Sequence, residues 1–301
     1  MMDRVASLNV FLQAAELRNF TAAGRRLGIS ASAVGKAISR LEERLGVQLF
    51  LRSTRSVTLT TEGEIFLVRC RRIFAEIEAA EADFSSSTAT PAGRLRISVP
   101  LTGMLLTPAI AEFARAFPLI ELDIDFSDRL VDIIEEGFDI VLRTGSATDS
   151  RLMTRTIGSF SFAVVASPDY LARAGTPQTP EDLKPHACLH HRRTTSGKLV
   201  DWGLKRDGAK LDLVLPTTMI LNTVEPLIGL AERGIGITSL PNFAVRRQLR
   251  EGSLISILGS YMDDAGAFRM VWPEGRQLLP RVRAFIEFMS EHLAGELDEG
   301  K

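Results

Sequence analysis

The stretch from Ser85 to Gly93 divides this chain of 301 residues into two parts with different sequence patterns. It reads Ser-Ser-Ser-Thr-Ala-Thr-Pro-Ala-Gly, a run of small and polar residues closed by proline and glycine that is typical of a hinge. Before it, apolar residues recur at helical spacing, whereas after it strands and helices are expected to alternate. The chain is therefore predicted to fold as a helical front part joined by a hinge to an α/β body.

The first sixty residues indicate three short helices. The apolar face of the first is marked by Val5, Leu8, Phe11, Leu12 and Ala15. A second helix, over 20–27, ends at Gly28, whose missing Cβ permits a left-handed turn. Ser30 is a natural N-cap for the third helix, since the Ser30 hydroxyl can accept from a free backbone N–H. This helix spans 31–45 and stops at Gly46. This pattern matches the helix-turn-helix outline, although an ordinary helical hairpin would give the same pattern.

Two short strands, 47–52 and 56–60, are expected next, on either side of the polar turn 53–55. They predict a β-wing with Arg52 and Arg55 at its tip, where guanidinium groups can meet phosphates or a minor groove. Residues 1–60 contain nine Lys or Arg and four Asp or Glu, a net charge of +5. The other 241 residues contain 27 Lys or Arg and 33 Asp or Glu, a net charge of −6. A basic front part on an acidic body is typical of a polyanion-binding module, and a solvated basic face is the alternative.

One long helix is predicted from Thr61, its expected N-cap, to about Ser85. Its roughly 24 residues would make a rod of about 36 Å, about one turn of DNA. The spacing of its apolar residues predicts the seam of a two-chain coiled coil, formed by Phe66, Cys70, Ile73, Ile77, Ala80 and Phe84. A helix packed on its own core could show the same stripe. Cys70 is interpreted as a buried seam residue rather than a redox switch.

The body begins with a β-α-β-α-β series, which favours a doubly wound sheet. Its expected elements are strands at 95–99, 120–126 and 138–142 and helices at 107–117 and 130–136. Further strands are expected at 160–166, 235–240 and 268–272, and further helices after Ser167-Pro168, after Thr179-Pro180, over 223–233 and over 280–293.

Two cysteines, Cys70 and Cys188, cannot form a disulfide framework, which favours a reducing cytoplasm. No apolar run approaches the roughly 18 residues that a membrane span needs. A cleaved secretory signal is not expected, because polar residues interrupt the apolar stretch at the N-terminus. On a strand, His186, Cys188 and His190 would share one face, as metal ligands could. A strand with Cys188 buried and no metal is the preferred interpretation.

Several segments at fixed spacing resemble the LysR-type transcriptional regulators. They are Phe20-Thr21-Ala22-Ala23, Ala33-Val34, Ile38-Ser39-Arg40-Leu41-Glu42, the run from Leu45 to Arg55, Leu59-Thr60-Thr61-Glu62-Gly63, Pro168-Asp169-Tyr170-Leu171 and Gly234-Ile235-Gly236-Ile237. The resemblance covers essentially the whole length. It implies a winged helix-turn-helix at 1–60, a dimerising linker helix at 61–87, a hinge at 88–93 and an effector-binding domain at 94–301. That domain would be a two-lobed α/β module like a periplasmic binding protein. One lobe would comprise residues of about 94–163 together with 267–301, and the other would comprise about 164–266.

By this resemblance the residues expected to contact DNA are Thr21, Ser30, Ala31, Ser32, Gly35, Lys36, Ser39, Arg40, Arg52 and Arg55. The family's recognition helix usually carries a Ser-Arg pair where this chain has Gly35-Lys36. Gly35 offers only its backbone and weakens the helix by up to ~1 kcal/mol. Lys36 keeps the charge but loses bidentate recognition of guanine. We therefore expect fewer direct base contacts and more dependence on DNA shape and phosphates.

Two-lobed α/β modules bind small molecules between their lobes, where strand ends and helix N-termini present unpaired N–H groups. The candidates for effector binding are Thr102, Gly103, Ser127, Asp128, Thr144, Asn222 and Thr223, with Arg143 on the same edge. These groups favour an anionic effector, such as a carboxylate or an aromatic acid. Each residue could equally serve as a cap, a turn or a surface residue.

The leading hypothesis is a DNA-binding regulator of transcription whose operator binding changes with a small effector. Its expected partners are double-stranded promoter DNA, RNA polymerase and further copies of itself, as a homodimer or homotetramer, and no cofactor is expected. An enzyme is not expected, since the body shows no Gly-x-Ser-x-Gly elbow, no Walker or Rossmann glycine set, no His-Glu-x-x-His motif and no credible triad. The alternative is a solute-binding module that has lost DNA binding, which only Gly35-Lys36 suggests.

Overall fold

A computed structural model describes residues 4–52, 57–84, 90–144, 151–262, 265–274 and 279–298. The chain divides into two compact units. The first comprises residues 1–86 together with 132–137, and the second comprises 87–131 with 138–301. Each unit has its own hydrophobic core. Most of the expected hinge, residues 85–89, lies outside the described residues.

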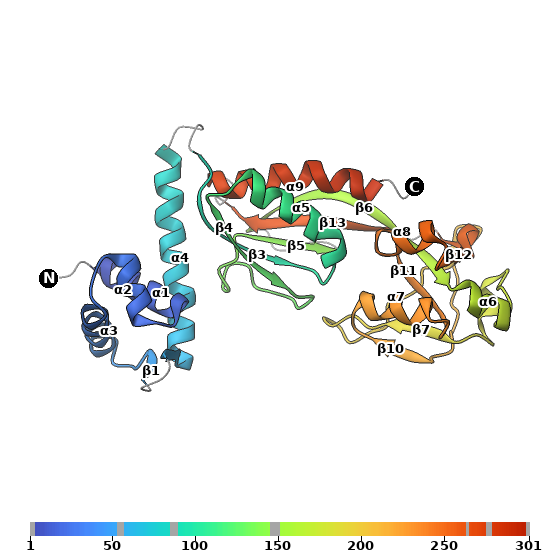
Figure 1. The fold of residues 1–301 in the computed structure, drawn as a ribbon, viewed down its shortest axis with the longest axis horizontal. Helices are drawn as coiled ribbons and strands as arrows, with labels where there is room; N and C mark the ends of the chain where they lie inside the picture. The colour runs from blue at the N-terminus through green and yellow to red at the C-terminus, as the bar shows by residue number, and fades with distance from the viewer. Residues whose placement is uncertain are drawn as a thin grey trace. The chain divides into compact units, whose positions relative to one another are not determined.

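The first unit packs three short helices and a two-stranded wing against part of one long helix (Figure 1). Its elements are α1 (Arg4–Leu17), α2 (Phe20–Leu27), α3 (Ala31–Leu45), β1 (Phe50–Arg52), β2 (Val57–Leu59) and α4 (Thr61–Phe84). The two strands are antiparallel, with Phe50 opposite Leu59. The C-terminal half of α4 extends beyond α1, α2 and α3 in Figure 1.

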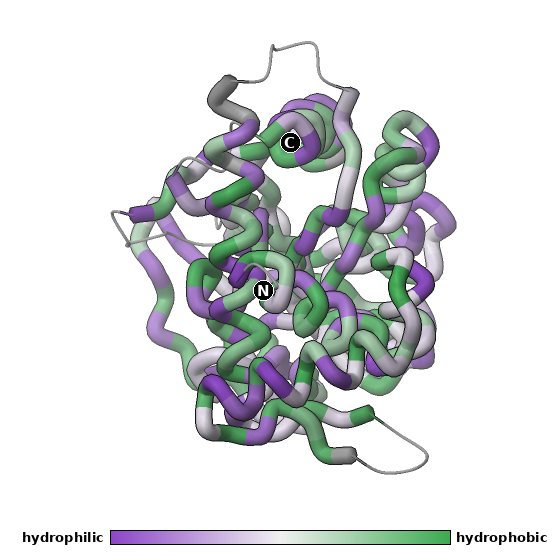
Figure 2. The backbone as a smooth tube through the Cα atoms, turned by 90° about the vertical axis from the view of Figure 1, so that its left-hand side faces the viewer, coloured by the Kyte–Doolittle hydropathy of each residue, from purple (hydrophilic) through white to green (hydrophobic). Residues whose placement is uncertain are grey.

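An aromatic cluster joins the helices, the wing and α4. The ring of Phe11, which is fully buried, lies 5.5 Å from that of Phe50 and 5.0 Å from that of Phe66. Phe20 meets Phe50 edge to face at 5.5 Å. Such pairs contribute about 0.5–1.5 kcal/mol each beyond the area that they bury. Figure 2 shows hydrophobic and hydrophilic residues interspersed along the helices, as amphipathic packing requires.

The second unit is a two-lobed α/β structure built on one mixed sheet. The described strands follow the order β10-β7-β11-β6-β13-β5-β3-β4, and β12 also pairs with β6. Its strands are β3 (Gly93–Val99), β4 (Ile120–Phe126), β5 (Ile140–Thr144), β6 (Leu152–Ala166), β7 (Cys188–His191), β8 (Lys205–Arg206), β9 (Ala209–Lys210), β10 (Met219–Leu221), β11 (Ile237–Pro241), β12 (Ile255–Ile257) and β13 (Ala265–Pro273). Its helices are α5 (Gly103–Ala116), α6 (Pro168–Ala174), α7 (Val224–Glu232), α8 (Asn242–Glu251) and α9 (Pro280–Asp298), with the 3-10 turns η1 (Pro180–Leu183) and η2 (Gly259–Tyr261).

Strand β6 is long enough to take part in both lobes. Its first part pairs with β13, and its last part pairs with β11 and β12. We call the lobe with β3, β4, β5 and β13 lobe I, and the lobe with β7, β10, β11 and β12 lobe II. Helices α5 and α9 pack on lobe I, whereas α6, α7 and α8 belong to lobe II (Figure 1).

The predicted architecture, a helix-turn-helix front part, a long helix and a two-lobed α/β body, is confirmed, but the doubly wound series needs correction. Strand β3 is parallel to β4 and β5, while β13 inserts antiparallel between β5 and β6. The helix predicted at 130–136 does not form, and the chain instead makes a turn at 133–137. Asp132 accepts from the backbone N–H of Glu135 at 2.7 Å, and Glu136 accepts from that of Asp132 at 3.1 Å. These local bonds favour a turn in a segment too short to form a stable helix.

Several boundaries also differ from the predictions. Helix α5 begins at Gly103, four residues earlier than predicted, and Pro108 lies inside it. The residue that caps α4 is Thr60 and not Thr61, because Thr60 Oγ1 accepts from the backbone N–H of Gly63 at 2.9 Å. The elements α8, β10, β12 and the β8–β9 hairpin were not predicted. Among the described helices, none combines the length and the apolar character that crossing a membrane would require.

Candidate nucleic-acid interface and ligand site

The turn between α2 and α3 is fixed by short-range contacts. Asn19 accepts from the backbone N–H of Ala22 at 3.0 Å and caps α2, and Ser30 accepts from that of Ala33 at 3.2 Å and caps α3. Gly28 has φ = +69°, as predicted for the residue that ends α2. These contacts fix where α2 ends and where α3 begins.

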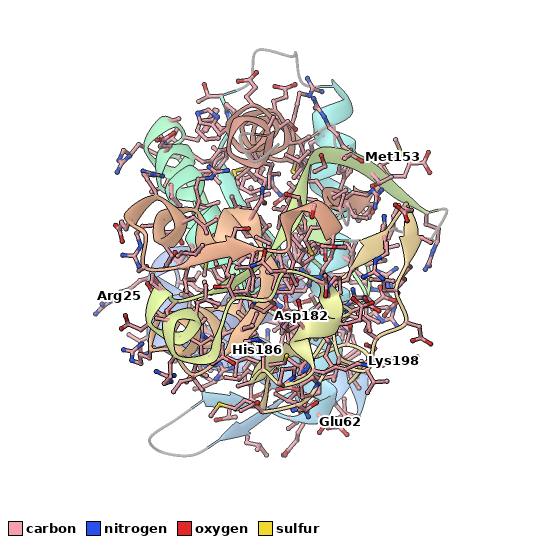
Figure 3. The ribbon with its side chains drawn as sticks, turned by 90° about the vertical axis from the view of Figure 1, so that its right-hand side faces the viewer. Arg25, Glu62, Met153, Asp182, His186 and Lys198 are labelled. Carbon is pink, nitrogen blue, oxygen red and sulfur yellow. The ribbon has the colours of Figure 1, made fainter. Side chains whose placement is uncertain are left out.

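Helix α3 buries one face and exposes the other. Its buried residues are Val34, Ala37, Ile38 and Leu41. Ser32, Lys36 and Arg40 are exposed along the opposite side, while Ala31, Gly35 and Ser39 are half-buried. Thr21 and Ser30 are also exposed, and Arg25 of α2 points outward in Figure 3. The predicted DNA contacts on α2 and α3 are thus all accessible to a ligand.

Three hydroxyl groups on this face are already engaged. Ser39 Oγ donates to the backbone oxygen of Gly35 at 3.0 Å, and the hydroxyl oxygens of Ser30 and Ser32 lie 3.0 Å apart. A hydroxyl bonded to its own helix is a weaker candidate for a phosphate or a base. The charged side chains of Lys36 and Arg40 are the stronger candidates.

The wing is tied to α3 by one carboxylate. Glu42 Oε1 accepts from the backbone N–H groups of Leu49 at 2.9 Å and Phe50 at 3.1 Å. Glu42 was expected only as part of the family resemblance, and this role was not predicted. Arg52 ends β1, but its side chain lies outside the described residues, as does Arg55 in the wing tip.

Two positions of the predicted dimer seam on α4 pack within their own unit. Cys70 is fully buried in the core of its own unit, and Phe66 contacts Phe11 in that core. Cys70 therefore has no exposed surface to offer a second copy, whereas Phe66 is half-buried. The side chain of Phe84 lies outside the described residues.

The other half of the predicted seam lies on the outside of α4. Ile73, 42% exposed, lines a groove of about 550 Å³ together with Ile77 and Ala80. Arg69, Arg72 and Glu76 form the rest of its lining. Arg69 and Arg72 also form ion pairs with Glu135 of the same unit, at 3.5 Å and 2.9 Å.

Both cysteines are buried packing residues. Burial raises the pKa of the Cys70 thiol and of the Cys188 thiol to about 12 each. Both thiols are therefore protonated at neutral pH, and the thiolate is the reactive form of cysteine. Their environments favour a structural role over redox sensing.

Lobe I brings its predicted ligand residues to one edge. Thr102 and Gly103 open α5 after β3, Ser127 and Asp128 follow β4, and Thr144 ends the parallel strand β5. Asp128 accepts from the backbone N–H of Leu101 at 3.0 Å, so part of its role is to hold this turn. Thr102 does not cap α5 with its side chain. Within the described residues its hydroxyl oxygen is buried and has no hydrogen-bond partner.

The adjacent arginine is held by lobe I itself. Arg143 donates to the hydroxyl of Ser98 at 2.8 Å and to the backbone oxygen of Arg129 at 3.3 Å. It therefore contributes positive charge at this edge from a position that protein contacts hold.

Lobe II brings Asn222 and Thr223 to the corresponding edge of its part of the sheet. They follow β10, which is parallel to β7, and they open α7, where Thr223 makes no side-chain cap. His191, at the end of β7, lies opposite Leu221. Burial lowers the pKa of His191, whereas a hydrogen bond to the backbone of Asn222 and the charge of Asp128 act in the opposite direction. His191 of lobe II is thus near Asp128 of lobe I.

His191 was not predicted as a site residue, because only the alternate residues His186, Cys188 and His190 would share one face of a strand. Those three have separate partners: His186 Nδ1 lies 3.1 Å from the Tyr170 hydroxyl, Cys188 packs in the core of lobe II, and His190 Nε2 lies 2.8 Å from the backbone oxygen of Pro216. His186 precedes β7, so the predicted shared strand face is wrong at that residue. The charge of Asp182 acts on His186, and Figure 3 shows the two close together. In the part of the chain that the structure describes, no three His, Cys, Asp or Glu side chains are grouped as metal ligands.

Comparison with protein families gives two matches that together span most of the chain. Residues 5–64 match the bacterial regulatory helix-turn-helix protein, lysR family, and residues 88–294 match the LysR substrate binding domain. The HTH-type transcriptional regulator CrgA of Neisseria meningitidis serogroup C is 35% identical over 300 residues, which cover 99% of each chain. The regulator YhjC of Escherichia coli is 32% identical over 309 residues, covering 99% of this chain and all of YhjC.

Solved structures agree with these matches. The structure of CrgA, a LysR-type transcriptional regulator from Neisseria meningitidis, is similar with a TM-score of 0.63 and 34% identity, covering 95% of this chain and 98% of that one. The full-length structure of the Vibrio cholerae virulence activator AphB has a TM-score of 0.53 and 25% identity, covering 95% of this chain and 98% of AphB. A full-length OxyR variant from Pseudomonas aeruginosa is similar with a TM-score of 0.67 and 19% identity, covering 97% of this chain and 95% of the OxyR chain. This likeness shows that the two share the fold.

Proposed function

The chain belongs to the LysR-type transcriptional regulators, and from this premise we propose that it binds operator DNA as a dimer and alters that binding when a small anionic effector enters its second unit. The observation that carries the proposal is the exposed row Ser32, Lys36 and Arg40 on α3 of a basic helix-turn-helix unit. A helix of this kind can enter the major groove with its exposed side toward the bases. Bound at a promoter, such a dimer would control the access of RNA polymerase.

Lys36→Ala is expected to weaken operator binding several-fold. The side chain is exposed on the free face of α3, so its removal takes away a phosphate contact without disturbing the core. The logarithmic dependence of affinity on salt should also become shallower by about one ion. Fluorescence anisotropy with the duplex that the full-length protein selects from a random library measures both quantities.

Lys198→Ala is the matched control, because Lys198 is an exposed lysine of the second unit (Figure 3). It should leave affinity and salt dependence unchanged. Equal affinities of Lys36→Ala and the unsubstituted protein at fixed salt would exclude the role given to Lys36.

The dimer is proposed to form through the groove on α4. A second copy of the helix suits it because Ile73, Ile77 and Ala80 offer apolar contact and the groove carries both signs of charge. In a two-fold contact each residue meets the same surface of its partner, so Arg69 or Arg72 of one copy can approach Glu76 of the other. The 24 residues of α4 span about 36 Å, which suits two recognition helices one turn of DNA apart.

The effector is proposed to bind between the edges of lobes I and II. Two helix N-termini, those of α5 and α7, lack side-chain caps there, and their free backbone N–H groups favour a negative charge. Arg143 adds positive charge, and the buried hydroxyl of Thr102 offers a donor without a protein acceptor among the described residues. An effector that binds one arrangement of the lobes more tightly would shift the population of DNA-binding states.

Thr102→Val is expected to abolish effector binding without harming the fold. Valine matches threonine in shape, and the hydroxyl that it removes is buried without a partner among the described residues, so stability should be equal or slightly higher. A panel of aliphatic and aromatic carboxylates, screened by thermal shift on the full-length protein, should contain at least one compound that raises Tm. That shift should disappear in Thr102→Val.

Thr102→Ser is the control, since it keeps the hydroxyl and should keep the shift. A panel that never changes Tm would contradict the anionic effector. A shift of equal size in Thr102→Val would contradict the assignment of Thr102 alone.

A further inference from the structure

Glycines are unfavourable inside helices, so each one in the helix-turn-helix part, residues 4–64, calls for a reason in the fold. Gly28 and Gly46 have φ of +69° and +71°, which side chains rarely adopt. A Cβ on Gly24 would lie 2.6 Å from the backbone oxygen of Ile29, and one on Gly63 would collide with that of Leu49. Each of these four glycines is therefore required by the turn or the packing around it.

Gly35 has no such reason. It lies inside α3 with ordinary helical backbone, and a Cβ built on it would meet no atom within 4 Å among the described residues beyond its chain neighbours and the nearby backbone of α3 itself. Alanine would fit without a clash and would favour the helix. The internal structure of the unit thus gains nothing from the missing side chain.

The position of Gly35 indicates that its missing side chain matters for contact with a ligand rather than for the fold. It is half-buried on the flank of the exposed row formed by Ser32 and Lys36, on the helix proposed to enter the groove. One turn further on, Ser39 folds its hydroxyl back to the backbone oxygen of Gly35 at 3.0 Å. Few side-chain atoms therefore project from α3 at this turn, and the backbone of Gly35 lies close to the outer surface of the helix.

We propose that Gly35 determines operator specificity by letting the backbone of α3 come into van der Waals contact with the DNA, where a Cβ would hold the helix away. This inference rests on the proposed function and deepens it. Glycine commonly serves where backbone must approach a ligand closely. The contact would be set by the local shape of the duplex, because the glycine has no side chain to read a base edge.

The test compares full-length Gly35→Ala with the unsubstituted protein on the duplex that the latter selects from a random library. Affinity for that duplex should fall at least 10-fold, while affinity for an unselected duplex of the same length should stay the same. The Tm of the first unit should rise by about 4 °C, since alanine is the better helix former. A residue with only a structural role would not combine higher stability with weaker specific binding.

Gly295→Ala is the matched control, because Gly295 is an exposed glycine in α9 whose added Cβ would also meet nothing within 4 Å among the described residues. It should leave DNA binding unchanged. Equal affinity of Gly35→Ala for the selected duplex, together with selection of the same sequences from the library, would overturn the proposal while leaving the proposed function intact. Failure of the unsubstituted protein to select any duplex would instead overturn the proposed function, and this inference with it.

Discussion

Ile73→Glu is expected to convert the dimer into a monomer and to reduce operator affinity at least 100-fold. Ile73 is 42% exposed in the groove on α4 and is not part of the core of its unit, so each chain should still fold. In the dimer the new carboxylate would be buried beside apolar side chains, at a cost of about 3 kcal/mol or more. Because two linked recognition helices bind far more tightly than one, loss of the dimer also removes most of the operator affinity.

Sedimentation equilibrium measures the dimer, and anisotropy on the selected duplex measures DNA binding. Val214→Glu is the control, since Val214 is 89% exposed in lobe II and the same change there should affect neither quantity. Retention of the dimer in Ile73→Glu at micromolar concentration would rule out the groove as the interface. A monomer that still binds the operator with full affinity would rule out the link between dimerisation and DNA binding.

Glu42→Ala is expected to destabilise the first unit by about 2–4 kcal/mol, because it leaves two backbone N–H groups without their acceptor. Those groups belong to Leu49 and Phe50, which are both 1% exposed, so solvent is a poor substitute partner. The wing would lose its bond to α3, and the packing of Phe50 against Phe11 and Phe20 would loosen with it. Urea unfolding followed by circular dichroism measures the loss of stability.

Glu43→Ala is the matched control for this change, since Glu43 is the exposed neighbour on the same helix. It should alter stability by less than about 0.5 kcal/mol. Glu42→Gln keeps an acceptor oxygen but loses the charge, so its stability should lie between that of Glu42→Ala and that of Glu43→Ala. A Glu42→Ala protein as stable as Glu43→Ala would show that the carboxylate does not hold the wing.

The seam on α4 illustrates what periodicity can and cannot predict. The spacing of Phe66, Cys70, Ile73 and Ile77 correctly predicts a helix with an apolar stripe. It does not say which part of the stripe meets the same chain. Because the short helices cover only one end of α4, Cys70 is buried in its own unit while Ile73 remains on the surface. That division depends on contacts between residues far apart in sequence.

The proposed effector site between lobes I and II likewise has features that could be predicted from the sequence and others that could not. The positions of Thr102, Ser127 and Asn222 after their strands could be predicted, because a strand followed by a turn or a helix start has a local pattern. The proximity of His191 to Asp128 could not, since these residues lie 63 positions apart in the chain and belong to different lobes. The antiparallel insertion of β13 between β5 and β6 likewise has no counterpart in the local pattern.

Local patterns in the amino-acid sequence were enough to predict the helix-turn-helix, the caps at Ser30 and Ser167, the left-handed turns at Gly28 and Gly46, and the long helix. Each of these depends on residues within a few positions of one another, where steric limits and single hydrogen bonds fix the backbone. The folded chain was needed to establish which face of α4 stays exposed, how the mixed sheet is ordered, and that the fold itself does not require Gly35. Those outcomes depend on packing between distant segments, and a local pattern does not identify the segment against which it will pack.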